Sequence, residues 1–185
     1  YNNGNGSSSG HVRVYNYYLG FWIQLGSDID GEAVSDYSGW SVSLSSDGTT
    51  LAIGALYNDG NGTDSGHVRI YNHNGTSWSK LGSDIDGETV NDQSGSSVSL
   101  SSDGKTVAIG ANKNDGNGSD SGHVRIYNYN DSSWTQLGSD IDGEAANDQS
   151  GHSVSLSSNG NIVAIGGYYN DGNGSESGNV RVYNY

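Results

Sequence analysis

A block of 56 residues occurs three times in this chain, with no gaps between the copies. A period of this length is typical of propellers, solenoids and repeat arrays. A residue that recurs in every copy is therefore expected to hold the repeat together rather than to perform chemistry. We expect one repeat domain over residues 1–185, cut from a longer periodic pattern: a partial repeat at 1–10, full repeats at 11–66, 67–122 and 123–178, and a partial repeat at 179–185.

Each block contains four short segments with strand character, separated by turn residues. In the first block the leading pair is Ser41 to Ser46 and Leu51 to Ala55, joined by Asp47-Gly48, which is a tight hairpin signal. The other pair, taken from the second block, is His67 to His73 and Ser77 to Gly82, and no segment shows a helical period. Bulky aliphatic residues alternate with serine and alanine, which suits closely stacked sheets. We predict an all-β fold of four-stranded antiparallel propeller-type blades in tandem 56-residue repeats.

Two stretches resemble the FG-GAP repeat family, which is known from bacterial and algal surface proteins and is a distant relative of the integrin α-subunit propeller. They are Ser38-Gly39 through Ala55, and the glycine-then-strand pattern from Gly66 to Tyr71. The resemblance implies propeller blades, an extracellular or cell-surface location, and a role in adhesion or binding. Integrin-type blades carry a calcium loop between their first two strands. Here that loop is only Ser46 to Thr49, and its single aspartate cannot supply the six to eight oxygens of a calcium site.

The composition excludes several classes of partner. The net charge is −14 with only seven basic residues, so nucleic acid and anionic membranes are poor partners. No apolar run approaches the roughly 20 residues of a membrane-spanning helix, and we expect no membrane insertion. The chain has no cysteine and so has neither disulfides nor thiolate metal sites. It also lacks an initiator methionine and a signal peptide, which we interpret as a mature or excised segment.

Acidic residues recur in two loops of each block, and they allow two readings. Asp-x-Asp-Gly-Glu, as at residues 28–32, is only a fragment of a calcium loop. In the loop at residues 58–66 and in its next copy, carboxylates and amides could converge on calcium; the candidate ligands are Asp59, Asn61, Asp64, Asp115, Asn117 and Asp120. The other reading is a solvated turn whose side chains cap backbone amides. We expect no cofactor to be required, and calcium stays possible.

Six acceptor sequons for N-linked glycans, Asn-x-Ser/Thr, occur in the chain, and all fall in predicted loops. Four lie 56 residues apart and two lie at the tip between the third and fourth segments. We expect N-glycosylation in a eukaryotic host at Asn5, Asn61, Asn74, Asn117, Asn130 and Asn173.

The basic and aromatic residues are also periodic. Arginine recurs at Arg13, Arg69, Arg125 and Arg181, and histidine recurs at His11, His67 and His123. Such regularity favours structural roles, for example an arginine paired with a carboxylate of a neighbouring sheet. The recurring tryptophans read as packing residues first and sugar-stacking platforms second. We predict no catalytic residues and no enzymatic activity.

The copies differ in a few places, and these carry more functional information than the shared residues. The first copy places apolar side chains where the other copies are polar, and such patches usually contact a partner. We predict a self-association surface that includes Tyr18, Leu19, Phe21, Ile23, Tyr37 and Trp40. Three blocks also fall short of the roughly 4–8 blades of a closed propeller.

Together these observations predict an extracellular structural or adhesive repeat glycoprotein that assembles with itself into a filament or surface layer. The alternative is a propeller-type module that binds glycans or surface proteins, with calcium as a possible requirement.

Overall fold

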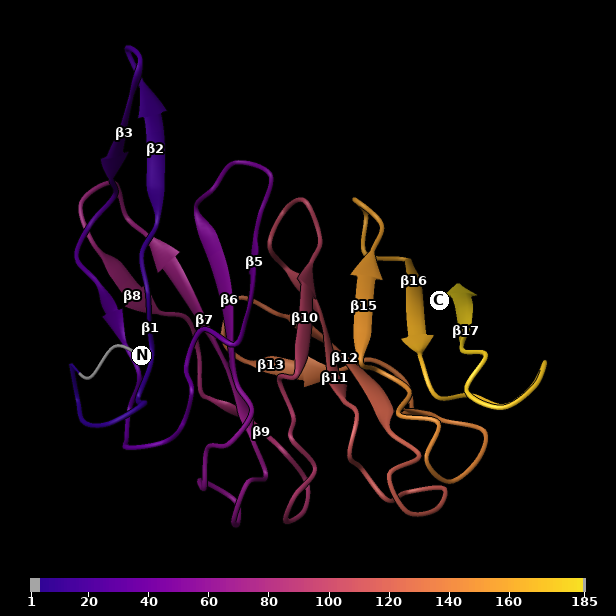
Figure 1. Ribbon diagram of the computed structural model, residues 1–185. Coiled ribbons are helices and arrows are strands. Elements are labelled where there is room, and N and C mark those ends of the chain that lie inside the picture. Colours follow the sequence, from indigo (N-terminus) through magenta and orange to yellow (C-terminus); the bar gives the residue numbers. More distant parts are fainter. Residues whose placement is uncertain (1–3, 185) are drawn as a thin grey trace.

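The computed structural model describes residues 4–184, and all regular secondary structure in that range is β-strand (Figure 1). Every strand pairing is antiparallel, and the strands recur with the period of the sequence. The prediction of an all-β fold of antiparallel sheets in tandem repeats is therefore confirmed. Within the described range no helix is available to cross a lipid bilayer.

The first complete sheet contains five strands. They are β5 (Ser41–Leu44), β6 (Thr50–Ala55), β7 (His67–His73), β8 (Trp78–Lys80) and β9 (Ile85–Asp86). The first four follow one another across the sheet in chain order, and β9 pairs with β7. The next repeat builds the same sheet from β10 (Ser97–Leu100), β11 (Thr106–Ala111), β12 (His123–Tyr129), β13 (Trp134–Gln136) and β14 (Ile141–Asp142).

Smaller sheets lie before and after these two. The third repeat forms a three-stranded sheet from β15 (Ser153–Leu156), β16 (Ile162–Gly167) and β17 (Asn179–Asn184). Near the start of the chain, β1 (His11–Val12) pairs with β4 (Ile29–Asp30), and β2 (Tyr15–Tyr18) pairs with β3 (Phe21–Gln24).

The strand β9 departs from the sequence prediction, which counted four strands in a repeat. The strand β7 has seven residues but β8 pairs only with Tyr71 to His73, so the start of β7 has a free edge. Ile85 and Asp86 fill that edge by pairing with Val68 and His67. The acidic stretch at 84–88, which the sequence analysis interpreted as a fragment of a calcium loop, therefore contains a short strand. Its Ile85 is buried in the core.

The antiparallel order gives the molecule two distinct ends. The β5–β6 and β7–β8 turns and their repeats lie at one end, which we name the hairpin end. The loops at 56–66 and 87–96 and their repeats lie at the other, which we name the loop end (Figure 1). The β5–β6 turn is held by Asp47, whose Oδ1 accepts hydrogen bonds from the Ser45 hydroxyl (2.6 Å) and the Thr49 amide (2.9 Å). These bonds hold the pKa of Asp47 below its usual value.

Successive sheets stack through the same hydrogen bonds each time. The Ser41 hydroxyl donates to Gly95 O (2.7 Å), and the Leu100 amide donates to Ser43 Oγ (2.9 Å). Trp78 Nε1 donates to Leu25 O (2.8 Å) in the preceding repeat. Each bond recurs one repeat later, from Ser97 to Gly151, from Leu156 to Ser99 and from Trp134 to Leu81.

Gly54, near the end of β6, permits this close stacking. A Cβ on Gly54 would lie 2.1 Å from the carbonyl oxygen of Gly95, so a side chain at this position would separate the two sheets.

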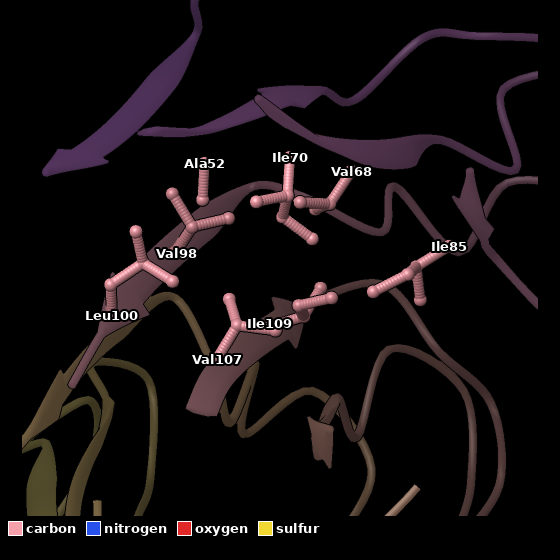
Figure 2. Close-up of a cluster of buried hydrophobic side chains, with 8 residues drawn as sticks. All are labelled: Ala52, Val68, Ile70, Ile85, Val98, Leu100, Val107 and Ile109. Atoms are coloured by element: carbon pink, nitrogen blue, oxygen red, sulfur yellow. The ribbon is translucent and has the colours of Figure 1, made fainter. Parts of the chain in front are cut away.

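The hydrophobic core lies between sheets rather than within one. Figure 2 shows one of its clusters, in which Ala52, Val68 and Ile70 of one sheet face residues of the next sheet. Their partners include Val98, Leu100, Val107 and Ile109. Equivalent clusters form on both sides, one around Leu51 and Ile53 and one around Val163 and Ile165. Each repeat therefore depends on its neighbours for burial of its apolar faces.

Candidate functional site

The two outer faces of the stack expose residues that are buried inside it. On the first face, Val42 and Leu44 of β5 are 52% and 46% exposed, whereas the equivalent Val98 and Leu100 of β10 are 8% and 7% exposed. On the last face, Val180 and Val182 of β17 are 71% and 65% exposed, whereas Val124 of β12 is fully buried. We name these the leading face (Val42, Leu44) and the trailing face (Val180, Val182). They correspond to the two halves of an internal interface.

The hairpin β2–β3 carries most of the residues predicted for self-association. Tyr18, Leu19, Phe21 and Ile23 are all exposed, and Leu19 at the tip is 78% exposed with a positive φ of 50°. The equivalent residues of the next hairpin are polar (Asn74, Gly75, Ser77 and Ser79). Residues 14–27 carry no charge in a chain of net charge −14. The hairpin is therefore an uncharged apolar projection of the hairpin end (Figure 1).

Tyr37 and Trp40 lie elsewhere. They belong to the segment that leads into β5, so they lie at the loop end, opposite to Leu19. The structure therefore separates the six residues predicted as one contact surface into two sets. Tyr37 packs edge-on against Tyr57, with ring centroids 5.3 Å apart.

Residues that differ between repeats gather at this loop end. In the third repeat His152 contacts Tyr168 (4.3 Å between centroids), and Tyr168 contacts Tyr169 (4.1 Å). At the corresponding place in the second repeat, Asn112 Nδ2 donates a hydrogen bond to the side-chain oxygen Oε1 of Gln149, 3.3 Å away. The loop end thus combines a shared backbone with side chains that vary from repeat to repeat.

Two of the candidate calcium ligands of the loop at 58–66, Asp59 and Asn61, make side-chain hydrogen bonds within the protein. Asp59 Oδ1 accepts a hydrogen bond from the Asp64 amide (2.9 Å), and Asn61 Nδ2 donates to Gly87 O (2.8 Å). The next copy repeats this arrangement at Asp115 and Asn117, and there Asp120 also pairs with Lys113 Nζ at 2.6 Å. This geometry matches the reading of a solvated turn that caps backbone amides. Calcium binding by Asp59, Asn61 and Asp64 stays a prediction for titration.

The recurring arginines link carboxylates of adjacent repeats. Arg69 pairs with Asp84 (3.0 Å) and with Glu32 of the preceding repeat. Burial opposes the charge of Arg69, but its hydrogen bonds to Asp84 and Glu32 outweigh burial and raise its pKa. Arg125 and Arg181 likewise pair with Glu88 and Glu144. Arg13 pairs with Asp28 (2.7 Å), and this bond together with one from Gln24 lowers the Asp28 pKa to about 2.

Two groups of histidine and carboxylates lie beside these arginines. They are Glu32, His67 and Asp84, and Glu88, His123 and Asp140. In the first group the guanidinium of Arg69 already binds both carboxylates, so it compensates one of the two negative charges that would attract a metal ion. Burial, and then the nearby arginine, lower the pKa of His67 and His123, so both rings are neutral at pH 7. These contacts support the predicted structural role of the recurring histidines and arginines.

The six sequons divide between the two ends. Asn5, Asn61, Asn117 and Asn173 lie in loops of the loop end, and Asn74 and Asn130 lie at tips of the hairpin end. All six residues are exposed, as the sequence predicts.

A family model described as the FG-GAP repeat matches three segments, residues 28–71, 83–127 and 140–183, which together make up well over half of the chain. A search of curated proteins found no match. Among solved structures, the chain is similar to a candidate 6-phosphogluconolactonase from Bacteroides uniformis, with a TM-score of 0.63 and 12% identity. The match covers 96% of this chain and 45% of that protein, so the chain spans about half of its length. At this identity the likeness concerns the fold alone. The repeated family match shows that the chain belongs to the FG-GAP repeat family.

Proposed function

We propose that the chain is a propeller-type structural and adhesive module of a cell-surface protein, and that it assembles head to tail with further copies of itself. In this proposal each complete sheet is a blade. The observation that carries the proposal is the pair of outer faces, because each presents residues whose equivalents are buried on one side of an interface that the molecule already contains twice.

Hydrogen-bonding groups support the same contact. Inside the stack the Leu100 amide donates to Ser43 Oγ, and the Leu156 amide donates to Ser99 Oγ. By the same geometry, the Leu44 amide of one copy would donate to Ser155 Oγ of the preceding copy, whose β17 would take the place of β1 against Leu51 and Ile53. A head-to-tail contact of this kind continues into a ring or a filament, depending on the rotation between copies.

Family membership supports the surface location and the lack of catalysis. FG-GAP repeats suggest a propeller-like module and are typical of extracellular or surface proteins. In this chain the recurring arginines pair with carboxylates of the preceding repeat, which supports a structural role for these groups. We therefore propose a non-enzymatic role.

Analytical ultracentrifugation of the purified chain over a range of concentrations tests the assembly. We expect larger species at high concentration, and we expect salt to favour them because each copy carries a charge of −14. Val180→Asp should keep the chain monomeric, whereas Thr63→Asp, which adds the same charge on an exposed loop, should not. A chain that stays monomeric at several hundred micromolar, or a V180D variant that assembles like the parent, would overturn the proposal.

The aromatic residues of the loop end favour a second candidate function, in which the module binds glycans or protein ligands. Tyr37, Tyr57, Tyr168 and Tyr169 are at positions that vary between repeats, and a tyrosine-rich surface supplies large contact area at a low entropic cost. A glycan array probed with the chain, in the presence and absence of calcium, tests this function. Binding that Tyr57→Ser and Tyr169→Ser remove would support it, and an array without signal would count against glycans.

A further inference from the structure

Two sequons of the loop end, at Asn61 and Asn117, use the nitrogen atom to which a glycan would be attached. Asn61 Nδ2 donates hydrogen bonds to Gly87 O (2.8 Å) and Glu88 O (3.1 Å). Asn117 Nδ2 donates to Gly143 O (2.8 Å) and Glu144 O (3.0 Å) in the same way. A side-chain amide has two N–H donors, so both are occupied in each of these residues.

These amides hold two loops of the loop end together. The loop at 58–66 and the turn after β9 are joined by Asn61, and the turn has no room for an additional group. Gly87 is buried, and a Cβ on it would lie 2.0 Å from Ser65 O. An N-linked glycan replaces one Nδ2 hydrogen, so a glycan on Asn61 would break one of the two bonds and force a sugar against this packed turn. Asn61 and Asn117 are therefore structural links between loops.

The sequons of the hairpin end have the opposite arrangement. Asn74 accepts with its carbonyl oxygen, from the amides of Thr76 and Ser77, both at 3.0 Å. Asn130 accepts in the same way from Ser132 (3.1 Å) and Ser133 (2.9 Å). The Nδ2 atoms of Asn74 and Asn130 donate no hydrogen bond within the described residues, and a Cβ on Gly75 would meet nothing within 4 Å. The turn is thus fixed through the oxygen, and the nitrogen faces open space.

We propose that N-linked glycans are attached at Asn74 and Asn130, and that Asn61 and Asn117 stay unmodified in the folded protein. The proposal rests on passage of the chain through a secretory pathway, as the proposed surface function requires. It places one glycan on the hairpin tip of each of two successive repeats. The equivalent tip of β2–β3 has no sequon and carries Leu19 and Phe21, so it would remain bare.

The chain contains its own matched pair for a test, because Asn61-Gly62-Thr63 and Asn74-Gly75-Thr76 are the same tripeptide. The whole chain would be secreted from a eukaryotic cell line with an added signal peptide, and its glycans released enzymatically in ¹⁸O-labelled water so that mass spectrometry reports occupancy at each asparagine. We expect Asn74 and Asn130 to be occupied and Asn61 and Asn117 to be empty. Equal occupancy of Asn61 and Asn74, or an empty Asn74, would overturn the proposal.

A second measurement on unglycosylated protein tests the structural half of the proposal, whatever the result of secretion. Asn61→Asp replaces the donating nitrogen by an oxygen that faces two carbonyl oxygens, and should lower the melting temperature by about 3 °C or more. Asn74→Asp keeps the accepting oxygen and should leave the melting temperature unchanged. An N61D variant as stable as N74D would contradict the assignment. Neither measurement depends on self-assembly, so a failure here is distinct from a failure of the proposed head-to-tail contact.

Discussion

The strands β5 and β10 have the same sequence, Ser-Val-Ser-Leu, and differ in their surroundings. Val98 and Leu100 of β10 are buried in a core cluster with Ala52 of the preceding sheet, whereas Val42 and Leu44 of β5 face solvent (Figure 2). The same four residues are therefore core in one repeat and surface in another. Burial in this molecule is decided by the presence of a neighbouring repeat, as expected for a protein whose stability depends on contacts between adjacent repeats.

The largest expected difference is between Leu100→Ala and Leu44→Ala. The first change removes a side chain that is 7% exposed and should lower the free energy of unfolding by about 2–5 kcal/mol. The second removes a side chain that is 46% exposed, and should cost less than about 1 kcal/mol. Urea unfolding of both variants at low protein concentration measures the two effects.

Protein concentration gives this comparison a control. If copies stack through the leading face, the loss of unfolding free energy caused by L44A should increase as the protein concentration rises. The loss caused by L100A should not depend on concentration. Equal costs for the two variants in dilute monomer would mean that β5 and β10 do not differ in solution as they do in the structure.

A smaller effect is expected for the arginines. Arg69 joins Glu32 and Asp84 across two repeats with a side chain that is 15% exposed, whereas Arg13 pairs with Asp28 on the surface. Arg69→Gln should cost about 1–3 kcal/mol, because it removes the cation that joins Glu32 to the partly buried Asp84, although Asp84 keeps its pair with Lys80. Arg13→Gln should have a much smaller effect, since exposed pairs contribute little. Thermal unfolding of both variants at pH 7 measures the difference, and a larger loss for R13Q would contradict it.

Ser99 and Ser155 occupy the same place in successive repeats. Within the described residues, a following sheet packs on Ser99 but not on Ser155. Its hydroxyl oxygen accepts the Leu156 amide at 2.9 Å. Ser99→Ala should therefore cost about 1 kcal/mol, and Ser155→Ala should cost nothing measurable. Chemical denaturation of the two variants resolves this difference. A loss in S155A that grows with protein concentration would instead support assembly through the trailing face.

The smallest effect concerns pH. Burial lowers the pKa of His67 and His123 in the folded chain, so between the lowered value and about 6.5 the unfolded chain binds more protons. Stability should be complete above about pH 6.5 and should decrease as the pH falls below it. His67→Asn with His123→Asn should flatten this dependence, because asparagine does not titrate and already occupies the equivalent position 179. The pKa of Asp28 is lowered to about 2, so protonation of Asp28 reduces stability only in more acidic solution.

Much of the fold could be predicted from the sequence because strand and turn signals are local. The hairpin around Asp47-Gly48 and the strand from His67 to His73 lie where the pattern placed them. The strand β9 was missed because its two residues lie in an acidic run, and only the free edge of β7 explains their pairing. A single buried isoleucine between two aspartates was the available signal.

The interaction surfaces were harder to predict, because they depend on which residues meet across the repeats. The sequence placed Leu19 and Tyr37 on one surface, whereas the alternating strand directions place them at opposite ends. Asn61 and Asn74 have the same tripeptide, yet the bond from Asn61 to Gly87 spans 26 residues of sequence and is invisible to a local pattern. The periodicity of Arg69 did indicate its link to a carboxylate of the neighbouring sheet.

The bonds between sheets also constrain how a gene for this protein can change in length. Trp78 reaches Leu25 and Trp134 reaches Leu81, each across 53 residues, and Ser41 reaches Gly95 across 54. Duplication or deletion of one whole repeat leaves every such separation intact, since each contact joins only adjacent repeats. An insertion of any other size within a strand would change every such separation that spans it. Recombination between repeats can therefore lengthen or shorten the protein in steps of one sheet. Every interface between sheets would then be of a kind that the protein already contains.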